Sequence, residues 1–160
     1  MSGTVIDTER LRLLVRKPAE VLSWIDSLSA SDKAEVSADW LARVRAATVA
    51  DVWTCGFVVL HRGSGAAIGS CAYKSAPDPD GFVEIAYGVD PKHQGLGYAT
   101  EAAQALTKYA FGTGLVNIVR AHTLRVPNAS TRVLAKCGFE FVGDVIEPDD
   151  GPVWRWERRR

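Results

Sequence analysis

One segment, residues 83–101, constrains the fold of this 160-residue chain more than any other. Residues 83–89 are rich in β-branched and aromatic side chains and predict a strand. A loop with Gly95 and Gly97 follows, and apolar or small side chains then recur every three or four residues over 96–111, which predicts a helix. Glycines lack a Cβ, so successive backbone N–H groups can turn toward one point at the positive end of the helix dipole. The segment therefore predicts a site for an anion, most simply a phosphate.

Two other phosphate-binding signatures fit this segment poorly. A Walker-type loop needs Lys followed by Ser or Thr after its second glycine, and this loop has neither. A dinucleotide loop would need a glycine where Thr100 stands and an acidic residue about 20 positions further on, whereas residues 115–120 contain none. A nucleotide-binding protein of another type remains the weakest alternative.

The string Gln94-Gly95-Leu96-Gly97-Tyr98-Ala99 resembles the acyl-coenzyme-A motif of the GNAT-type N-acetyltransferases, Gln/Arg-x-x-Gly-x-Gly/Ala. Residues 84–91 before it and 98–102 after it are also similar to that superfamily, in particular to the branch with the ribosomal-protein-alanine N-acetyltransferases. Residues 127–139 resemble that branch's Asn-x-x-Ser…Lys-x-Gly-Phe helix, although the spacing from Asn128 to Gly138 is one residue short. Either Asn128 or Ser130 is therefore displaced from the family position. The resemblance covers 53–141, with a weaker match at 8–13.

The resemblance implies an α/β (α+β) domain with a mixed, mostly antiparallel central sheet, flanked by helices, in which a splayed strand pair holds acyl-CoA. The residue patterns also favour a mixed sheet, because strands first pair as hairpins and then alternate with helices. Strands are predicted at 10–15 (as an edge strand), 52–61, 66–74, 82–89, 118–124, 139–145 and 153–158, and helices at 19–29, 37–47, 96–111 and between a cap at Asn128 and Gly138. Residues 62–65 predict a hairpin turn. We expect a single domain over 1–160.

Composition excludes several classes of function. Nineteen basic residues balance nineteen acidic ones, so no overall charge attracts nucleic acid or an anionic membrane. Three cysteines without metal-ligand spacing favour free thiols in a reducing cytoplasm, and no metal site is expected from them or from His61 and His122, which we interpret as isolated. No apolar run approaches 20 residues and no signal peptide is evident, so we expect a cytoplasmic protein. The basic end, 158–160, predicts an exposed tail.

The resemblance also implies the co-substrate, acetyl-CoA, and the residues that contact it. The loop would hold the pyrophosphate, and backbone N–H groups near 87–89 would stabilise the oxyanion of the tetrahedral intermediate. The expected cofactor-binding residues are Tyr87, Gly88, Val89, Gln94, Gly95, Leu96, Gly97, Tyr98, Ala99, Thr100 and Asn128. Asn128 either hydrogen-bonds the pantetheine arm or serves only as a helix cap.

Two side chains are candidates for proton transfer. Glu84 shares a strand face with Ala86 and Gly88 and would take the proton from the acceptor's ammonium group, or else it orients a backbone group or pairs with an arginine. Many relatives carry a tyrosine just before the Gly-Phe pair, but 133–136 contain no hydroxyl. Ser130 is the nearest substitute as the acid that protonates the leaving sulfur. Its alternatives are a backbone hydrogen bond for the hydroxyl and water as the proton source.

Together these observations predict an acetyl-CoA-dependent N-acetyltransferase that works by direct attack in a ternary complex. Its acceptor would be a primary amine, either a peptide or protein N-terminus or a small-molecule amine. The alternative from another class is a CoA-binding sensor or regulatory module without turnover. Neither nucleic acid nor a membrane is an expected partner, and a homodimer is common in such folds, although no motif here demonstrates one.

Overall fold

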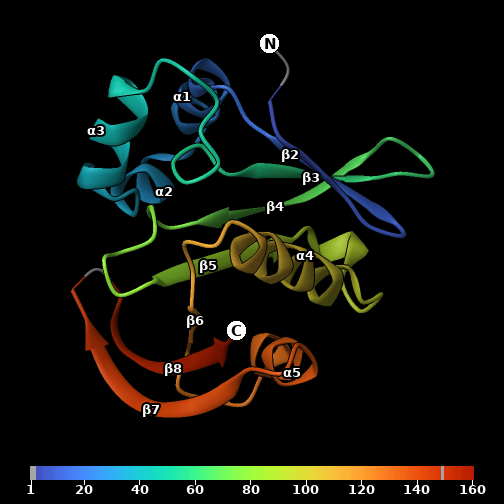
Figure 1. The fold of residues 1–160 in the computed structure, drawn as a ribbon. Helices are drawn as coiled ribbons and strands as arrows, with labels where there is room; N and C mark the ends of the chain where they lie inside the picture. The colour runs from blue at the N-terminus through green and yellow to red at the C-terminus, as the bar shows by residue number, and fades with distance from the viewer. Residues whose placement is uncertain (1–2, 149) are drawn as a thin grey trace.

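The structure is a computed structural model that describes residues 3–148 and 150–160. Within these residues eight strands form one sheet in the order β1-β2-β3-β4-β5-β6-β8-β7 (Figure 1). The strands are β1 Val5–Asp7, β2 Leu11–Val15, β3 Phe57–His61, β4 Ala67–Tyr73, β5 Phe82–Val89, β6 Ile118–Thr123, β7 Glu140–Glu147 and β8 Gly151–Arg159. The α-helices are α1 Pro18–Asp26, α2 Ala30–Ala34, α3 Ala38–Ala46, α4 Tyr98–Gly112 and α5 Ala129–Lys136. None of the helices in this part of the chain is long and apolar enough to cross a membrane.

The sheet is antiparallel except between β5 and β6. These two strands run parallel and pair from Phe82↔Ile118 to Glu84↔Arg120, and no pairing between them follows in the described chain. Beyond Glu84 the strands therefore separate, which leaves one edge of β5 without a neighbouring strand. The predicted mixed, mostly antiparallel sheet with a splayed strand pair is confirmed.

The two faces of the central strands differ in chemistry. On one face lie buried apolar side chains such as Tyr73 and Ile85, and the Tyr73 hydroxyl donates to the Leu106 carbonyl of α4 at 2.5 Å. Because side chains alternate along a strand, the opposite face carries Ala72 and Ala86, followed by charged residues. We call this second side the polar face of the sheet.

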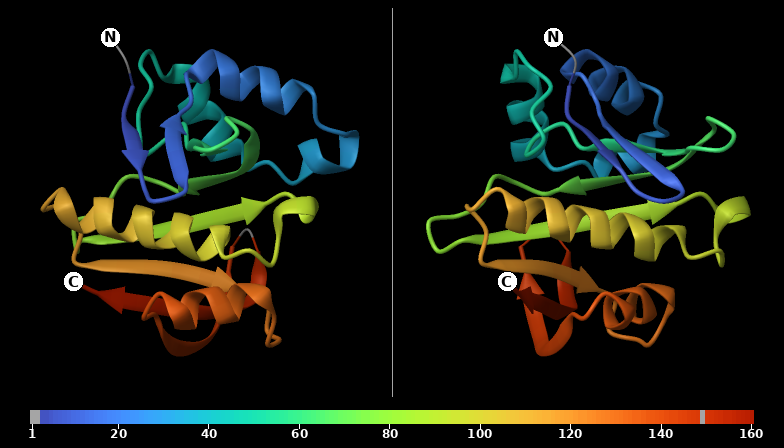
Figure 2. Two further views of the ribbon diagram at one scale, coloured as in Figure 1. Left: turned by 90° about the vertical axis from the view of Figure 1, so that its right-hand side faces the viewer. Right: turned by 45° about the vertical axis from the view of Figure 1, so that its right-hand side comes forward.

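The helices lie in three places around the sheet. Helix α4 runs along β5, while α1, α2 and α3 gather near β2, β3 and β4, and α5 lies with β6, β7 and β8 (Figure 2). The N-terminus of α4 is thereby brought next to the end of β5 and the start of α5. This is the region where the sequence predicted an anion site.

Some predicted boundaries were wrong. The strand at 10–15 is not an edge strand, because β1 pairs with it, and the three residues of β1 are too few to show a periodic pattern. The helix α2, with five residues, is also short and was not predicted. The strand predicted from residue 52 begins at Phe57, because the Asp51 carboxylate accepts from the backbone N–H of Trp53 and the hydroxyl of Thr54 and so holds 51–54 in a turn.

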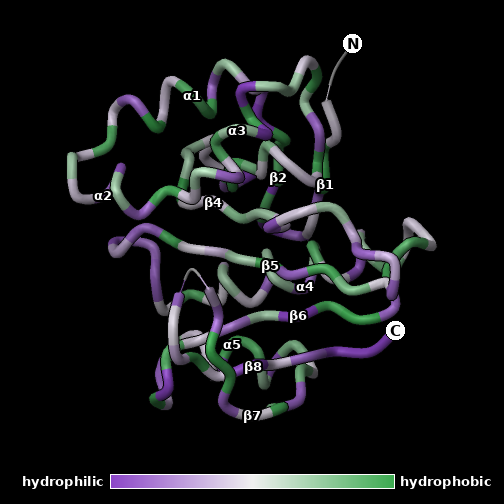
Figure 3. Tube along the Cα trace, turned by 90° about the vertical axis from the view of Figure 1, so that its left-hand side faces the viewer, coloured by the Kyte–Doolittle hydropathy of each residue, from purple (hydrophilic) through white to green (hydrophobic). Residues whose placement is uncertain are grey.

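The basic C-terminus is not a free tail. Arg158 and Arg159 belong to β8 and pair with Val119 and Ile118 of β6. The Arg158 guanidinium also donates to the Cys137 carbonyl at 2.8 Å. Figure 3 shows this end of β8 as hydrophilic (purple) although it is part of the sheet. The charge of residues 158–160 predicted an exposed tail, but the backbone pairing of β8 with β6 determines the conformation of Arg158 and Arg159.

Candidate functional site

The glycine loop between β5 and α4 has the backbone conformation that the sequence predicted. Gly95 and Gly97 have φ values of +78° and +86°, in the left-handed region that side chains disfavour. The side chain of Gln94 donates to the Val89 carbonyl at 2.8 Å and so ties the loop to the end of β5. Gly97 is the N-cap of α4 and no side chain caps this helix.

The backbone amides of residues 95–100 form an open cradle. None of them donates a hydrogen bond to another part of the described chain. The first N–H groups of a helix have no partner within the helix, and they carry the positive end of its dipole. A phosphate group supplies the acceptors that these amides lack. The loop can therefore bind a diphosphate through main-chain groups alone.

A pocket of about 340 Å³ lies beside this cradle. It is bounded by the end of β5, the glycine loop, the first turn of α4 and one side of α5. Of the expected site residues, those that line it are Tyr87, Gly88, Val89, Gln94, Gly95, Gly97, Tyr98, Ala99, Thr100 and Ser130. The structure thus brings together most of the residues predicted to bind the cofactor.

Two of the expected cofactor residues do not line the pocket. The side chain of Leu96 is 54% exposed, and its carbonyl accepts from the guanidinium of Arg10 at 2.8 Å. Asn128 is the N-cap of α5, where its side-chain oxygen accepts from the backbone N–H of Thr131 at 3.0 Å. The cap predicted for Asn128 is confirmed, and its contact with a pantetheine arm stays a prediction.

The free edge of β5 continues the pocket. The N–H of Lys74 donates to the Glu84 carbonyl and the N–H of Asp90 donates to the Ile68 carbonyl, so alternate residues of this segment bond to β4. The backbone groups of the residues between them, Tyr87 and Val89, point to the other edge, from which β6 has separated. These N–H groups are the ones that the sequence predicted as oxyanion donors.

Tyr87 of β5 and Ser130 of α5 meet at the pocket wall. The Tyr87 hydroxyl lies 3.4 Å from the Ser130 carbonyl, to which it donates, and both residues line the pocket. Burial raises the pKa of Tyr87, so its hydroxyl keeps its proton at neutral pH. The sequence pointed to Tyr87 only as a cofactor contact, but its phenol is a second candidate acid beside Ser130. No spacing in the chain signals that β5 and α5 bring these residues together.

Glu84 lies on the polar face, where two donors hold its carboxylate. Oε2 lies 2.9 Å from Nδ1 of His122 and 3.1 Å from Nζ of Lys74, whose ammonium group also contacts Asp150 at 3.2 Å. The Glu84 side chain is 20% exposed, so an acceptor can still reach it. Glu84 thus pairs with a lysine and a histidine rather than with the arginine considered as its alternative partner.

The interpretation of His122 as an isolated residue was wrong. His122 lies at the centre of this network. Its side chain is 4% exposed, and Nε of Arg155 lies 3.1 Å from its Nε2. A guanidinium can only donate, so Nε2 accepts and Nδ1 carries the proton that is donated to Glu84. Arg155 is held in turn by Glu147, at 2.7 Å. His122 and Arg155 are contacts of the candidate site that the sequence analysis missed, because the register between β5, β6 and β8 cannot be deduced from it.

We predict that His122 acts as a positioning residue for Glu84. His122→Leu removes the donor and should lower kcat about tenfold or more, the effect typical of a lost hydrogen bond to a charged group, while KM for acetyl-CoA stays unchanged. His122→Asn places an amide N–H near the position of Nδ1 and should retain most of the activity. Steady-state kinetics of the two variants test this. Equal losses in both would mean that the imidazole does more than orient Glu84.

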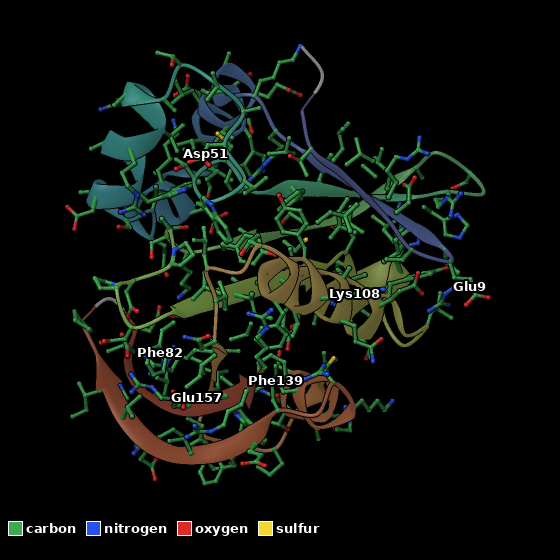
Figure 4. All side chains as sticks on the ribbon, in the orientation of Figure 1. Glu9, Asp51, Phe82, Lys108, Phe139 and Glu157 are labelled. Atoms are coloured by element: carbon green, nitrogen blue, oxygen red, sulfur yellow. The ribbon has the colours of Figure 1, made fainter. Side chains whose placement is uncertain are left out.

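A larger pocket, of about 950 Å³, lies on the other side of α4, against β1 and β2. Lys108, which Figure 4 labels on α4, is among the residues that line it. Of the three acidic residues that line this pocket, Asp7 pairs with Arg12, and the Glu101 carboxylate accepts from the Thr8 hydroxyl and from the backbone and side chain of Arg10. The smaller pocket is the better candidate site, because it is lined by Gly95 and by residues 97–100, whereas only Gly97 and Thr100 of the amide cradle line the larger one.

Comparisons with known proteins agree with this geometry. The model of the acetyltransferase (GNAT) domain family matches residues 4–140. The N-acetyltransferase YjdG of Bacillus subtilis (strain 168), itself uncharacterized, is 26% identical over 83 residues, which are 52% of this chain and 49% of that protein. The chain thus spans about half the length of the curated relatives it matches.

Two solved structures share the fold over almost the whole chain. The ribosomal L7/L12 α-N-protein acetyltransferase RimL, in complex with coenzyme A, has a TM-score of 0.72 at 16% identity over 98% of both chains. The aminoglycoside acetyltransferase AAC(6′)-Ib, also with coenzyme A, has a TM-score of 0.69 at 19% identity over 94% of this chain and 95% of that one. The family match over 4–140, together with this fold, shows that the chain belongs to the GNAT family of acetyltransferases.

Proposed function

We propose that this chain is an acetyl-CoA-dependent N-acetyltransferase that transfers the acetyl group to a primary amine by direct attack in a ternary complex. The observation that carries the proposal is the set of backbone amides from Gly95 to Thr100, which are unpaired within the described chain and open into the pocket. That cradle suits the pyrophosphate of CoA, and the free edge of β5 suits the amide groups of its pantetheine arm.

The proposed chemistry uses both sides of β5. The amine approaches from the polar face, where Glu84 takes its proton, and the amine nitrogen attacks the thioester carbon. The N–H groups of Tyr87 and Val89 donate to the oxyanion that forms on the carbonyl oxygen. When the intermediate collapses, the C–S bond breaks and the thiolate takes a proton from Ser130 or Tyr87. Holding both substrates together supplies much of the rate.

Two classes of amine are candidate acceptors. The names of the solved neighbours point to a protein α-amino group in one case and to an aminoglycoside in the other. We therefore propose a peptide or protein N-terminus or a small-molecule amine as the acceptor of this chain.

The three cysteines of the chain, Cys55, Cys71 and Cys137, are free and buried, in keeping with the cytoplasmic location expected from the sequence.

Two measurements on the purified protein test the proposal. Coenzyme A should raise the melting temperature, while NAD and ATP at the same concentration should not. Acetyl-CoA with a panel of primary amines and peptides should release free thiol at a rate that depends on the amine. Stabilisation by CoA without any amine-dependent thiol release would instead favour the regulatory CoA-binding module. Stabilisation by NAD or ATP alone would favour a nucleotide-binding protein.

A further inference from the structure

We propose that Arg16, held against Trp24, binds a carboxylate group of the acceptor. The spacing of strands in a sheet places this carboxylate about 10 Å from the amine that Glu84 deprotonates. The inference rests on the proposed function and adds the chemical class of the acceptor. It concerns a part of the polar face, at β2, β3 and β4, that lies outside the cofactor pocket.

Three contacts fix the side chain of Arg16 at the surface of the sheet. Its Nε donates to the Cys55 carbonyl at 3.1 Å, and its guanidinium carbon lies 5.2 Å from the centre of the Trp24 ring. Gly56 makes room for it, since a Cβ at Gly56 would lie 2.9 Å from Nη2 of Arg16 and 3.2 Å from the Cβ of Ala72. The guanidinium is thus laid along the sheet, beside Ala72, with its Nη groups left to donate.

Within the described residues, Arg16 differs from the other basic residues of the central polar face in having no ion pair with a carboxylate. Lys74, Arg120 and Arg155 each form an ion pair with a carboxylate, and the partners of Arg120, Phe82 and Glu157, are labelled in Figure 4. For Arg16, no carboxylate of residues 3–148 and 150–160 lies within 4.0 Å.

Burial makes this lack of a partner unfavourable. Desolvation lowers the pKa of the Arg16 guanidinium, and the carboxylate of Glu20, which lies beyond ion-pair distance, offsets this only in part. A bound carboxylate would supply the missing counter-ion and would accept two parallel N–H bonds from the planar guanidinium.

The register of the strands connects Arg16 to Glu84. The N–H of Arg16 donates to the Gly56 carbonyl, and Ala72 pairs with Ala86, two residues from Glu84 on the same face. The row of paired residues that runs from Arg16 to β5 therefore consists of Gly56, Ala72 and Ala86, which present a glycine and two methyl groups. With strands ~4.8 Å apart and a rise of ~3.3 Å per residue, the guanidinium and the Glu84 carboxylate lie on the order of 10 Å from each other.

The distance between Arg16 and Glu84 sets how far apart the amine and the carboxylate of the acceptor must be. An extended peptide covers ~10 Å in three residues, so an N-terminal amine at Glu84 would place the third residue at Arg16. The carboxylate can come from an acidic side chain near the peptide N-terminus or from the C-terminus of a tripeptide. Both sources present the same group, a carboxylate, to Arg16, and the comparison of acceptor peptides described next distinguishes them.

The test compares matched acceptors at saturating acetyl-CoA by thiol release. The first pair is Ala-Ala-Glu-Ala-amide and Ala-Ala-Gln-Ala-amide, and the second is Ala-Ala-Ala with a free C-terminal carboxylate and its amide. We expect kcat/KM to be about tenfold to a hundredfold higher for at least one acidic member, the effect of a hydrogen-bonded charge. The pair that shows the preference identifies the source of the carboxylate.

Variants then assign the preference to Arg16. Arg16→Gln should abolish the preference and leave the rate with the neutral peptides close to that of the wild type. Arg12→Gln is the matched control, because Arg12 lies in β2, four residues before Arg16, but is paired with Asp7, and it should keep the preference. Trp24→Leu, at a side chain 45% exposed, should weaken the preference and serves as the second variant if Arg16→Gln fails to fold.

The outcomes separate this inference from the proposed function. Equal kcat/KM for acidic and neutral acceptors in the wild type overturns the carboxylate site and leaves the acetyltransferase intact. The inference is also overturned if Arg16→Gln or Trp24→Leu lowers the rates with acidic and neutral peptides by the same factor. If no amine or peptide is acetylated although CoA binds, the proposed function itself fails.

Discussion

Glu84→Gln is expected to lower kcat by about 10²–10⁴-fold at neutral pH, the usual contribution of a positioned acid or base. The amide keeps the shape of the carboxylate but cannot accept the proton of the ammonium group. Glu84 lies on the polar face and is not among the residues that line the cofactor pocket. The Kd for CoA should therefore stay unchanged, so kinetics and calorimetry on the same variant separate chemistry from binding.

Glu157→Gln is the matched control for this experiment. Glu157 also carries a half-buried carboxylate on the polar face, where it pairs with Arg120 at 2.7 Å, but it does not contact Glu84, His122 or Lys74. The same chemical change there should leave kcat nearly unaltered. Near-normal turnover in Glu84→Gln would remove Glu84 from the reaction and make it a structural partner of His122 and Lys74.

The sequence predicted the conformation of the glycine loop correctly, because the signals for this part of the candidate site are local. Its features lie within one continuous segment: a strand, two glycines at the required positions and a helix N-terminus. Gly95 and Gly97 have positive φ values that few other residues adopt, so the residue type itself encodes the conformation. Asn128 likewise signals a helix start through its own side chain, and the structure shows that cap.

The acceptor half could not be predicted, because it depends on the register of distant strands. Glu84, His122 and Arg155 come from β5, β6 and β8, and Arg16 directly follows β2. The loop between β4 and β5, at 74–81, is too long to fix the pairing of Lys74 with Glu84 from turn chemistry. Local patterns showed which face Glu84 occupies, but not which side chains would meet it there. Only the completed sheet supplies those contacts.

Gly95→Ala is expected to raise the Kd for CoA about tenfold to a hundredfold, as loss of a charge-assisted hydrogen bond would. Gly95 has a φ of +78°, which an alanine adopts only at a cost of about 1–2 kcal/mol, so the loop should relax and turn its amides away from the phosphate. A Cβ at Gly95 would meet no protein atom within 4 Å, and this residue lines the pocket. Isothermal titration calorimetry with CoA measures the effect.

Gly114→Ala controls for the backbone strain in this comparison. Gly114 has nearly the same φ, +76°, and equally open surroundings, but it follows α4 at the end remote from the pocket and does not line it. Both variants should therefore lose a similar amount of stability in thermal melts, and only Gly95→Ala should lose affinity for CoA. If the two variants bound CoA equally well, the strain at Gly95 would have no bearing on the ligand. The amides of 95–100 would then not be the groups that hold the diphosphate.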